Sequence, residues 1–344
     1  MSVATGIALT AGAFIATASA TLAVRGALLR RRMMDIPNER SSHDVPVPRG
    51  GGIAFVTMIA AGLAVAAAGT GTLTASTMLP VVAMLGVAAI GLVDDARSVP
   101  ARVRLAVHLA CGLAAAIGPA MALAGQCSFG MPGTFAMAGA MAVAAAWTVN
   151  MVNFMDGIDG IAAMEGAFVL GAAGALAAWG GEETLAWTLA ACSAAVGGFL
   201  AVNMSPLRIF MGDCGSGALG LLIAWLLAEA VAAGAIGGWA AIALPAAFTA
   251  DAGVTLAVRL LSGERPAQAH RTHAYQRMVR RGAGHPRVTA AYALVNVFVV
   301  LPVAWLAQRS PSIAPTAVLS LHAALAAAAW MAGAGREPVS RTER

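Results

Sequence analysis

Two carboxylates and two glycines stand between long apolar stretches at residues 153–160, in a chain that is only 11% charged. The carboxylates are Asp156 and Asp159, and Asn153 precedes them at the same three-residue spacing. On a helix the three side chains would share one face, whereas the glycine after each carboxylate permits a turn that brings the backbone close to a ligand. Carboxylates beside apolar spans are costly without water, a cation or a polar partner. The run therefore predicts metal or phosphate chemistry.

Three further acidic residues border apolar stretches. Asp94 and Asp95 are adjacent, and because neighbouring carboxylates repel, the pair calls for a cation or an arginine nearby. For this pair alone, a helix stop on a solvated loop is an equally good interpretation. Asp213 lies in the glycine-rich run 210–217, which opens directly into an apolar stretch. The amide groups of such a helix start bind anions, and an adjacent carboxylate can hold Mg²⁺ against a phosphate.

Arginines and histidines fill the other polar loops. Arg49 precedes three glycines and is the better phosphate ligand, whereas the arginines at 30–32 are interpreted mainly as topology signals. His270, Arg271 and His273 share one loop. Its arginines favour phosphate or sugar recognition over a transition-metal site, for which softer ligands are lacking. The remaining histidines are given structural roles, namely His43, His108, His285 and His322.

The composition is that of an integral membrane protein. Of 344 residues, 59% are hydrophobic, and the mean hydropathy is +0.79. All 21 basic residues are arginine, which excludes a lysine nucleophile, a Schiff base or a lysine that grips phosphate. The arginines lie in short loops, so membrane orientation explains the basic pI better than nucleic-acid binding, and no nucleic-acid partner is expected. The four cysteines form no CxxC pair and indicate neither zinc nor a disulfide framework.

The predicted fold is an all-α, polytopic bundle of about ten or eleven transmembrane helices forming one domain over 1–335, followed by a short polar cytoplasmic tail at 336–344. Asp251, inside a predicted span, is given a structural or supporting role, with a site role as the alternative. The first span is interpreted as retained, since no basic segment precedes it. The candidate spans are 3–24, 51–69, 76–93, 105–124, 134–152, 161–179, 184–202, 218–234, 239–261, 288–307 and 313–332.

Alternating the loops across the membrane collects nearly all arginines on one face, and only Arg309 falls on the other. By the positive-inside rule the arginine-rich face is cytoplasmic and the N-terminus is periplasmic. Every motif described above falls on the cytoplasmic face. This pattern predicts one shared site, formed by five loops, at the cytoplasmic side of a bacterial inner membrane.

In series, these motifs resemble those of the polyprenyl-phosphate N-acetylhexosamine-1-phosphate transferases. The resemblance covers most of the chain and keeps the order of the motifs. It is carried by Asp-Ile-Pro-Asn-Glu-Arg-Ser-Ser-His and Pro-Val-Pro-Arg-Gly-Gly-Gly in 35–52, the Asp94-Asp95 pair, Asn-Phe-Met-Asp-Gly-Ile-Asp-Gly at 153–160 and Phe-Met-Gly-Asp-Cys-Gly-Ser at 210–216.

The resemblance implies transfer of a sugar-1-phosphate from a UDP-N-acetylhexosamine to undecaprenyl phosphate, with release of UMP. Mg²⁺ would be required, with Mn²⁺ as the alternative, and Asp213 would be its main ligand. Asp94 and Asp95 would prepare the lipid phosphate or assist the metal, and whether Asp94 acts as a base stays open. Asn153 and the catalytic acids Asp156 and Asp159 would line the nucleotide and catalytic pocket. Phe210 would stack on uracil, and Asn203 would lie nearby. The loop with His270, Arg271 and His273 would hold the sugar or diphosphate.

The last loop departs from the triple-histidine pattern of several branches. Its His-Arg-Thr-His-Ala-Tyr-Gln form at 270–276 looks more like the branch that begins O-antigen or other surface glycans. Two rival classes remain. A secondary transporter would also carry intramembrane acids, but near the midplane. A membrane aromatic prenyltransferase would carry aspartate-rich metal motifs, without the 210–213 turn and the histidine loop. A homodimer would be unsurprising.

Overall fold

The computed structural model describes residues 2–32, 34–36, 46–128, 130–204, 206, 208–264 and 270–336. Most of the first predicted motif, at 37–45, lies outside the described residues. So does 337–344 of the predicted tail. Among the described residues the chain is almost entirely helical, with one two-stranded antiparallel pairing of β1 and β2. The predicted all-α class is confirmed.

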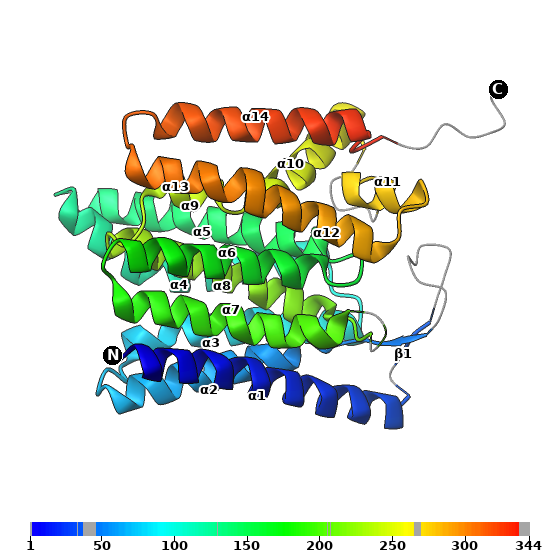
Figure 1. Cartoon of the computed structure of the whole chain (residues 1–344), viewed down its shortest axis with the longest axis horizontal. Coiled ribbons are helices and arrows are strands. Elements are labelled where there is room, and N and C mark those ends of the chain that lie inside the picture. Colours follow the sequence, from blue (N-terminus) through cyan, green and yellow to red (C-terminus); the bar gives the residue numbers. More distant parts are fainter. Residues whose placement is uncertain are drawn as a thin grey trace.

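The first half of the chain forms five helices and the short sheet, traversing the bundle back and forth (Figure 1). Thr74 caps the start of α3 through its side chain, and Pro132 stands in the first turn of α5, where its missing N–H costs nothing. The elements are α1 (Val3–Arg30), β1 (Met34–Asp35), β2 (Val47–Pro48), α2 (Ile53–Gly69), α3 (Ala75–Ala96), α4 (Ala101–Gln126) and α5 (Met131–Met155).

The second half adds the buried centre and the helices beside the histidine loop. Gly333, in the left-handed conformation, ends the last helix. The elements are α6 (Ile161–Trp179), α7 (Glu183–Asn203), α8 (Gly212–Ala232), α9 (Gly238–Ala243), α10 (Ala246–Leu261), α11 (Ala274–Arg280), α12 (His285–Val295), the π-helical η1 (Asn296–Val300), α13 (Leu301–Arg309) and α14 (Ala314–Ala332).

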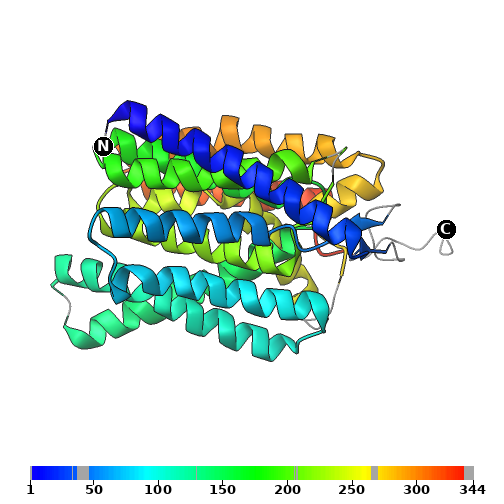
Figure 2. The same ribbon diagram turned by 90° about the horizontal axis from the view of Figure 1, so that it is seen from below.

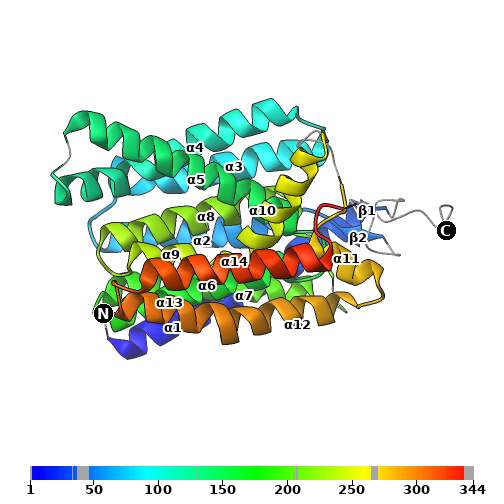
Figure 3. The same cartoon turned by 90° about the horizontal axis from the view of Figure 1, so that it is seen from above.

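Within the described residues, nine helices are long and apolar enough to cross a membrane. The number falls short of the predicted ten or eleven for two reasons. Helix α2 has only 17 residues. The predicted span 239–261 is wrong as a single helix, because the chain breaks at Leu244 and Pro245 into α9 and α10. A proline inside an apolar run removes a backbone donor and disrupts the helix at that point. Helix α10 consequently runs obliquely to its neighbours (Figure 3).

Helix α8 is the most enclosed of the spans and packs against α3, α4, α5 and α6. Glycines let backbones approach closely at these contacts, as in other membrane bundles. A Cβ on Gly220 would meet the backbone of Val149 on α5, and one on Gly91 of α3 would meet the backbone of Asp213. Helices α4 and α5 lie at one edge of the bundle (Figure 2). This packing fixes the start of α8 beside the end of α3.

The polar motifs gather at one end of the bundle, and the N-terminus lies at the other (Figure 1). At the end opposite the motifs, the Arg309 guanidinium stands 5.1 Å from the Trp305 ring centroid and 5.9 Å from that of Trp179. Arginine and tryptophan combine in this way where one face is apolar and the other wet. The two ends therefore differ in chemistry as well as in position.

Candidate active site

Backbone hydrogen bonds join the glycine run after β2 to the start of α8. The Phe210 N–H donates to the Pro48 carbonyl at 2.8 Å, and the Gly51 N–H donates to the Phe210 carbonyl at 2.8 Å. The Gly52 N–H donates to the Met211 carbonyl at 2.9 Å. A side chain at residue 52 would overlap α8. The glycines thus allow the backbones of 48–52 and 210–215 to pack directly together, although these segments are over 150 residues apart in the sequence. This backbone contact is called the seam below.

This seam places Arg49 beside two carboxylates from different helices. Its Nη2 lies 2.8 Å from Asp95 Oδ1 and 3.1 Å from Asp213 Oδ1. Burial lowers the pKa of the guanidinium, but the charges of Asp95 and Asp213 outweigh that effect and raise the pKa above its usual value. Arg49 therefore stays charged at any physiological pH.

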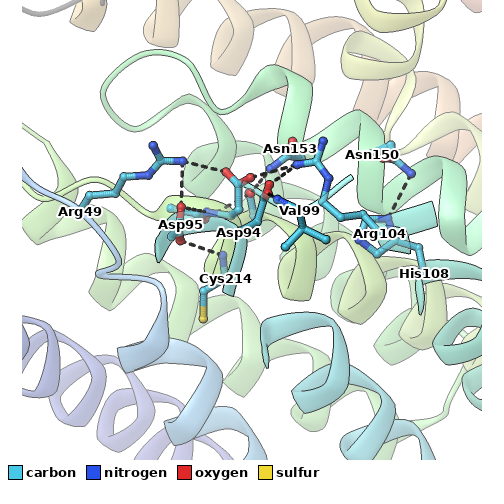
Figure 4. Close-up of polar contacts among 12 residues, drawn as sticks. Arg49, Asp94, Asp95, Val99, Arg104, His108, Asn150, Asn153 and Cys214 are labelled. Carbon is cyan, nitrogen blue, oxygen red and sulfur yellow. Dashed lines mark hydrogen bonds and ion pairs between the residues drawn. The ribbon is translucent and has the colours of Figure 1, made fainter. Parts of the chain in front are cut away.

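Arg104 lies on the other side of the acidic pair from Arg49 (Figure 4). It pairs with Asp94, and its Nη1 also lies 3.4 Å from Asp213 Oδ2. Asp94 further accepts a hydrogen bond from the Val99 N–H at 2.7 Å. Asp213 is therefore shared between two arginines. Arg104 is not among the site residues predicted from the sequence. It stands ten residues after Asp94, and this spacing carries no helical signal because the chain turns between α3 and α4.

Asp95 caps the start of α8. Its carboxylate accepts hydrogen bonds from the backbone N–H groups of Asp213 at 3.1 Å and Cys214 at 3.3 Å. Gly212, with a φ of +74°, makes the turn that presents these amides. A carboxylate at a helix N-terminus satisfies free donors and complements the helix dipole. Asp95 is thereby held in place, whereas the Asp213 carboxylate remains about a quarter exposed.

The carboxylates Asp94, Asp95 and Asp213 are hard oxygen donors. In the described part of the chain, no group of three or more acidic, histidine or cysteine side chains is arranged to hold a metal ion by itself. Mg²⁺, however, is commonly held by only one or two carboxylates together with substrate phosphates and water. The exposed carboxylate of Asp213 beside Asp95 fits that requirement. The two guanidinium groups fit the phosphates.

Asn153 and Asp156 lie at the end of α5, next to this centre. The Asn153 Nδ2 donates to Ser216 Oγ on α8 at 2.9 Å. Helix α5 ends at Met155, so Asp156 belongs to the turn rather than to a continuing helical face. Burial raises the pKa of the Asp156 carboxyl to about 7; the charge of Asp213 adds to the rise, and Arg49 opposes it. These interactions place Asp156 in the electrostatic field of the carboxylate centre.

Asp159 has a separate set of partners. Its carboxylate is 2% exposed and lies 3.1 Å from Arg208 Nε and 3.5 Å from His285 Nδ1. The Thr289 hydroxyl donates to its backbone carbonyl at 2.8 Å. Asp159 thus joins the α5–α6 turn to the start of α12, and its contacts differ from those of Asp156 although both belong to one sequence motif.

The segment before α8 is shaped by Asn203. Its Nδ2 donates to the Ile209 carbonyl at 2.7 Å, and the side chain is 4% exposed. This bond closes the connection between α7 and α8 next to Phe210, which also bridges to Arg49 through the backbone. Asn203 thereby supports the residue that the sequence assigns to nucleobase stacking.

The histidine loop lies against the same end of the bundle. The ring centroids of His270 and His273 are 5.0 Å apart, and His273 is 6.4 Å from Phe154. Burial lowers the pKa of His270 to about 4, with the nearby charges of His273 and Arg259 contributing, so His270 is neutral at pH 7. Arg271 is half-buried beside them. The loop thus presents stacked rings next to the Asp156 turn.

Comparisons with known proteins agree with the family resemblance that the motifs show. The profile described as glycosyl transferase family 4 matches residues 77–231. A decaprenyl-phosphate N-acetylglucosaminephosphotransferase of Mycolicibacterium smegmatis is 30% identical over 321 residues, covering 83% of this chain and 78% of that protein. The matched profile range contains eight of the predicted site residues, namely Asp94, Asp95, Asn153, Asp156, Asp159, Asn203, Phe210 and Asp213.

Two shorter matches point to the same group of proteins. A probable undecaprenyl-phosphate N-acetylglucosaminyl 1-phosphate transferase of Bacillus subtilis is 30% identical over 201 residues, which are 56% of this chain and 54% of that protein. A phospho-N-acetylmuramoyl-pentapeptide-transferase of Shouchella clausii is 34% identical over 193 residues, 52% of this chain and 59% of that protein. The chain thus spans little more than half the length of these two relatives.

Proposed function

Because the chain belongs to glycosyl transferase family 4, among the polyprenyl-phosphate N-acetylhexosamine-1-phosphate transferases, we propose that it transfers a sugar-1-phosphate from a UDP-N-acetylhexosamine to undecaprenyl phosphate. The products are undecaprenyl-diphosphate-sugar and UMP. The observation that carries the proposal is the meeting of three carboxylates and two arginines at one end of a membrane bundle. Such a group suits two anionic phosphates that must be brought together beside a bilayer.

In the proposed reaction, an oxygen of the lipid phosphate attacks the β-phosphorus of the UDP-sugar. The bond from that phosphorus to the bridging oxygen breaks, and UMP leaves with the bridging oxygen and its electron pair. Negative charge grows on the leaving oxygen, and the guanidinium groups of Arg49 and Arg104 can neutralise it. Both arginines already face the carboxylate centre, so little reorganisation is needed to meet a phosphate there.

Mg²⁺, held by Asp213 with help from Asp95, would supply charge neutralisation between the two phosphates. Mn²⁺ is the expected substitute. Asp94 is bound by Arg104 and the Val99 amide. Because the acceptor phosphate is ionised near neutral pH, the reaction needs no strong base, and Asp94 serves chiefly to orient Arg104.

The donor occupies the surrounding loops in this proposal. Phe210 stacks on the uracil, and Asn153 and Asp156 border the nucleotide. His273 and Arg271 face the sugar or the diphosphate. The backbone seam between Arg49 and Phe210 supports this arrangement, since it joins the residue assigned to the nucleobase to one assigned to phosphate.

The site is assigned to the cytoplasmic face of a bacterial inner membrane, where nucleotide sugars are made. The arginine-rich loops support that orientation through the positive-inside rule. We further propose that the product begins an O-antigen-like surface glycan, on the strength of the His-x-x-His form of the last loop. A homodimer is compatible with this role.

The test uses purified full-length protein in nanodiscs that contain undecaprenyl phosphate. A panel of UDP-aminosugars is added with Mg²⁺, and UMP and the lipid product are quantified by mass spectrometry. The proposal expects UMP and lipid-linked sugar in equal amounts for at least one donor, and neither with EDTA. Movement of a solute across vesicles without UMP release would instead favour a transporter.

A further inference from the structure

The side chain of Asp251, on α10, binds backbone amides at the junction of the histidine loop and α11. Its carboxylate accepts hydrogen bonds from the N–H groups of Ala274 at 2.8 Å and Tyr275 at 3.1 Å, and it lies 3.4 Å from His273 Nδ1. The Tyr292 hydroxyl donates to it at 2.6 Å. A buried carboxylate with this many donors is stable in place. Its position therefore fixes where the residues after His273 begin α11.

Tyr275 links the anchored start of α11 to the turn that contains Asp156. Its hydroxyl donates to the Phe154 carbonyl at 3.1 Å, one of the last carbonyls of α5, which lack helical partners. The Tyr275 ring also stacks on His273, with centroids 5.8 Å apart. Tyr275 is fully buried, so it touches neither a substrate nor solvent. It can act only through the groups it holds.

Gly157 makes this contact possible. A Cβ built on Gly157 would overlap the Tyr275 hydroxyl, and the next nearest atom, the Tyr275 Cζ, would be 3.1 Å away. The sequence assigned the glycines of this run to close approach of a ligand. At Gly157 the close approach is instead made by the buried phenol of Tyr275, in the first turn of α11 and 118 positions later in the chain.

We propose that Tyr275, anchored by Asp251, is a positioning residue that sets the distance between the histidine loop and the Asp156 turn. Both segments are assigned to the sugar nucleotide, so the inference on catalysis rests on the proposed function. If the link is lost, each segment still folds, but the two no longer present a donor site of fixed width. Loss of the link therefore weakens binding of the sugar-nucleotide donor and leaves binding of the lipid acceptor unchanged.

The two tyrosines of the chain give a matched pair of variants. Tyr275→Phe and Tyr292→Phe each remove one buried hydroxyl that donates a hydrogen bond, and only the first breaks the bond to Phe154. We expect Tyr275→Phe to raise the KM for the UDP-sugar about tenfold, the size of effect that loss of one buried hydrogen bond produces. The KM for undecaprenyl phosphate stays unchanged. Tyr292→Phe removes one donor to Asp251 but leaves it bound to the Ala274 and Tyr275 amides, so the loop stays anchored and the donor KM changes less than about twofold.

A compensating pair tests the contact itself. Gly157→Ala should raise the donor KM more than Tyr275→Phe, because its methyl group displaces the phenol. The double variant Gly157→Ala/Tyr275→Phe should be less impaired than Gly157→Ala alone, since the overlapping hydroxyl is gone. A purely destabilising effect lowers the amount of active protein, and so the apparent kcat, and leaves the donor KM unchanged.

Hydrogen exchange supplies a readout that does not need turnover. In nanodiscs, Tyr275→Phe should speed amide exchange in 156–160, whereas Tyr292→Phe should leave it at the wild-type rate. Equal effects of the two tyrosine variants on exchange or donor KM, or no rescue in the double variant, would overturn the inference. If wild-type protein released no UMP but the exchange difference held, the proposed function would fail and the positioning role would stand.

Discussion

Gly52→Ala tests the backbone seam between the glycine run and the start of α8, which places Arg49 beside Asp213. The backbone at Gly52 is ordinary, with φ −58° and ψ −24°, so alanine is tolerated by the local conformation. The added methyl would overlap the Gly215 Cα, and it would also lie 2.8 Å from the Met211 carbonyl oxygen and 2.9 Å from the Gly215 nitrogen. The effect is therefore steric and acts between α2 and α8.

The size of the effect follows from the separation required. Ordinary van der Waals contact begins at 3.4 Å, and the overlap with the Gly215 Cα is the largest, so α2 and α8 must separate by about 1 Å. A 1 Å misplacement of reacting groups can cost about a hundredfold in rate. A separation of that size predicts that kcat falls about a hundredfold, equivalent to about 2.7 kcal/mol. Arg49 and Asp213 move apart by the same displacement, since they lie on the two sides of the seam.

Gly62→Ala is the matched control, because it lies on the same helix with nothing within 4 Å of the added methyl. UMP release is measured for wild type and both variants, normalised to the protein that remains monodisperse in nanodiscs. The control should retain wild-type turnover. A Gly52→Ala protein that is folded and within twofold of wild type would refute the claim that this seam sets the catalytic geometry.

Three further predictions concern the site itself. Asp213→Asn should abolish Mg²⁺-dependent UMP release while the protein inserts and purifies normally; retained turnover would remove its role as metal ligand. Phe210→Ala should weaken binding of UDP-sugar, measured by calorimetry, with little change in acceptor KM, and unchanged affinity would exclude stacking. The raised pKa of Asp156, about 7 against the usual 3.8, means that the folded state keeps a proton that the unfolded state has lost. Stability should therefore fall as pH rises from about 4 to 7, and Asp156→Asn should flatten the apparent Tm over that range; the same slope in the variant would contradict the assignment.

The membrane fold and the gathering of the acidic motifs at one end follow from the sequence. Apolar runs of the right length give the helices, and alternation across the bilayer brings Asp94, Asp95 and Asp213 to the same end. Pro245 disfavours helix, but it lies inside the apolar run 239–261, which the hydropathy pattern alone predicts as one span. Hydropathy reports whether a segment tolerates lipid, and it does not distinguish a straight helix from a broken one.

What the sequence could not provide are contacts between distant segments. Arg104 reaches Asp213 from a separate helix, and Asp159 turns to Arg208 although its motif suggests a role shared with Asp156. Tyr275 fills the space that Gly157 leaves open. Each depends on how two helices pack, and neither residue type nor spacing along the chain encodes that directly.

The central claim is transfer of a sugar together with its phosphate, and a donor labelled with ³²P in the β-phosphate tests it directly. Purified protein is incubated with the labelled UDP-N-acetylhexosamine, Mg²⁺ and undecaprenyl phosphate. We expect the label to move into the lipid fraction while unlabelled UMP is released in equal amount. Label that remains with the nucleotide as UDP, with sugar alone on the lipid, would contradict it.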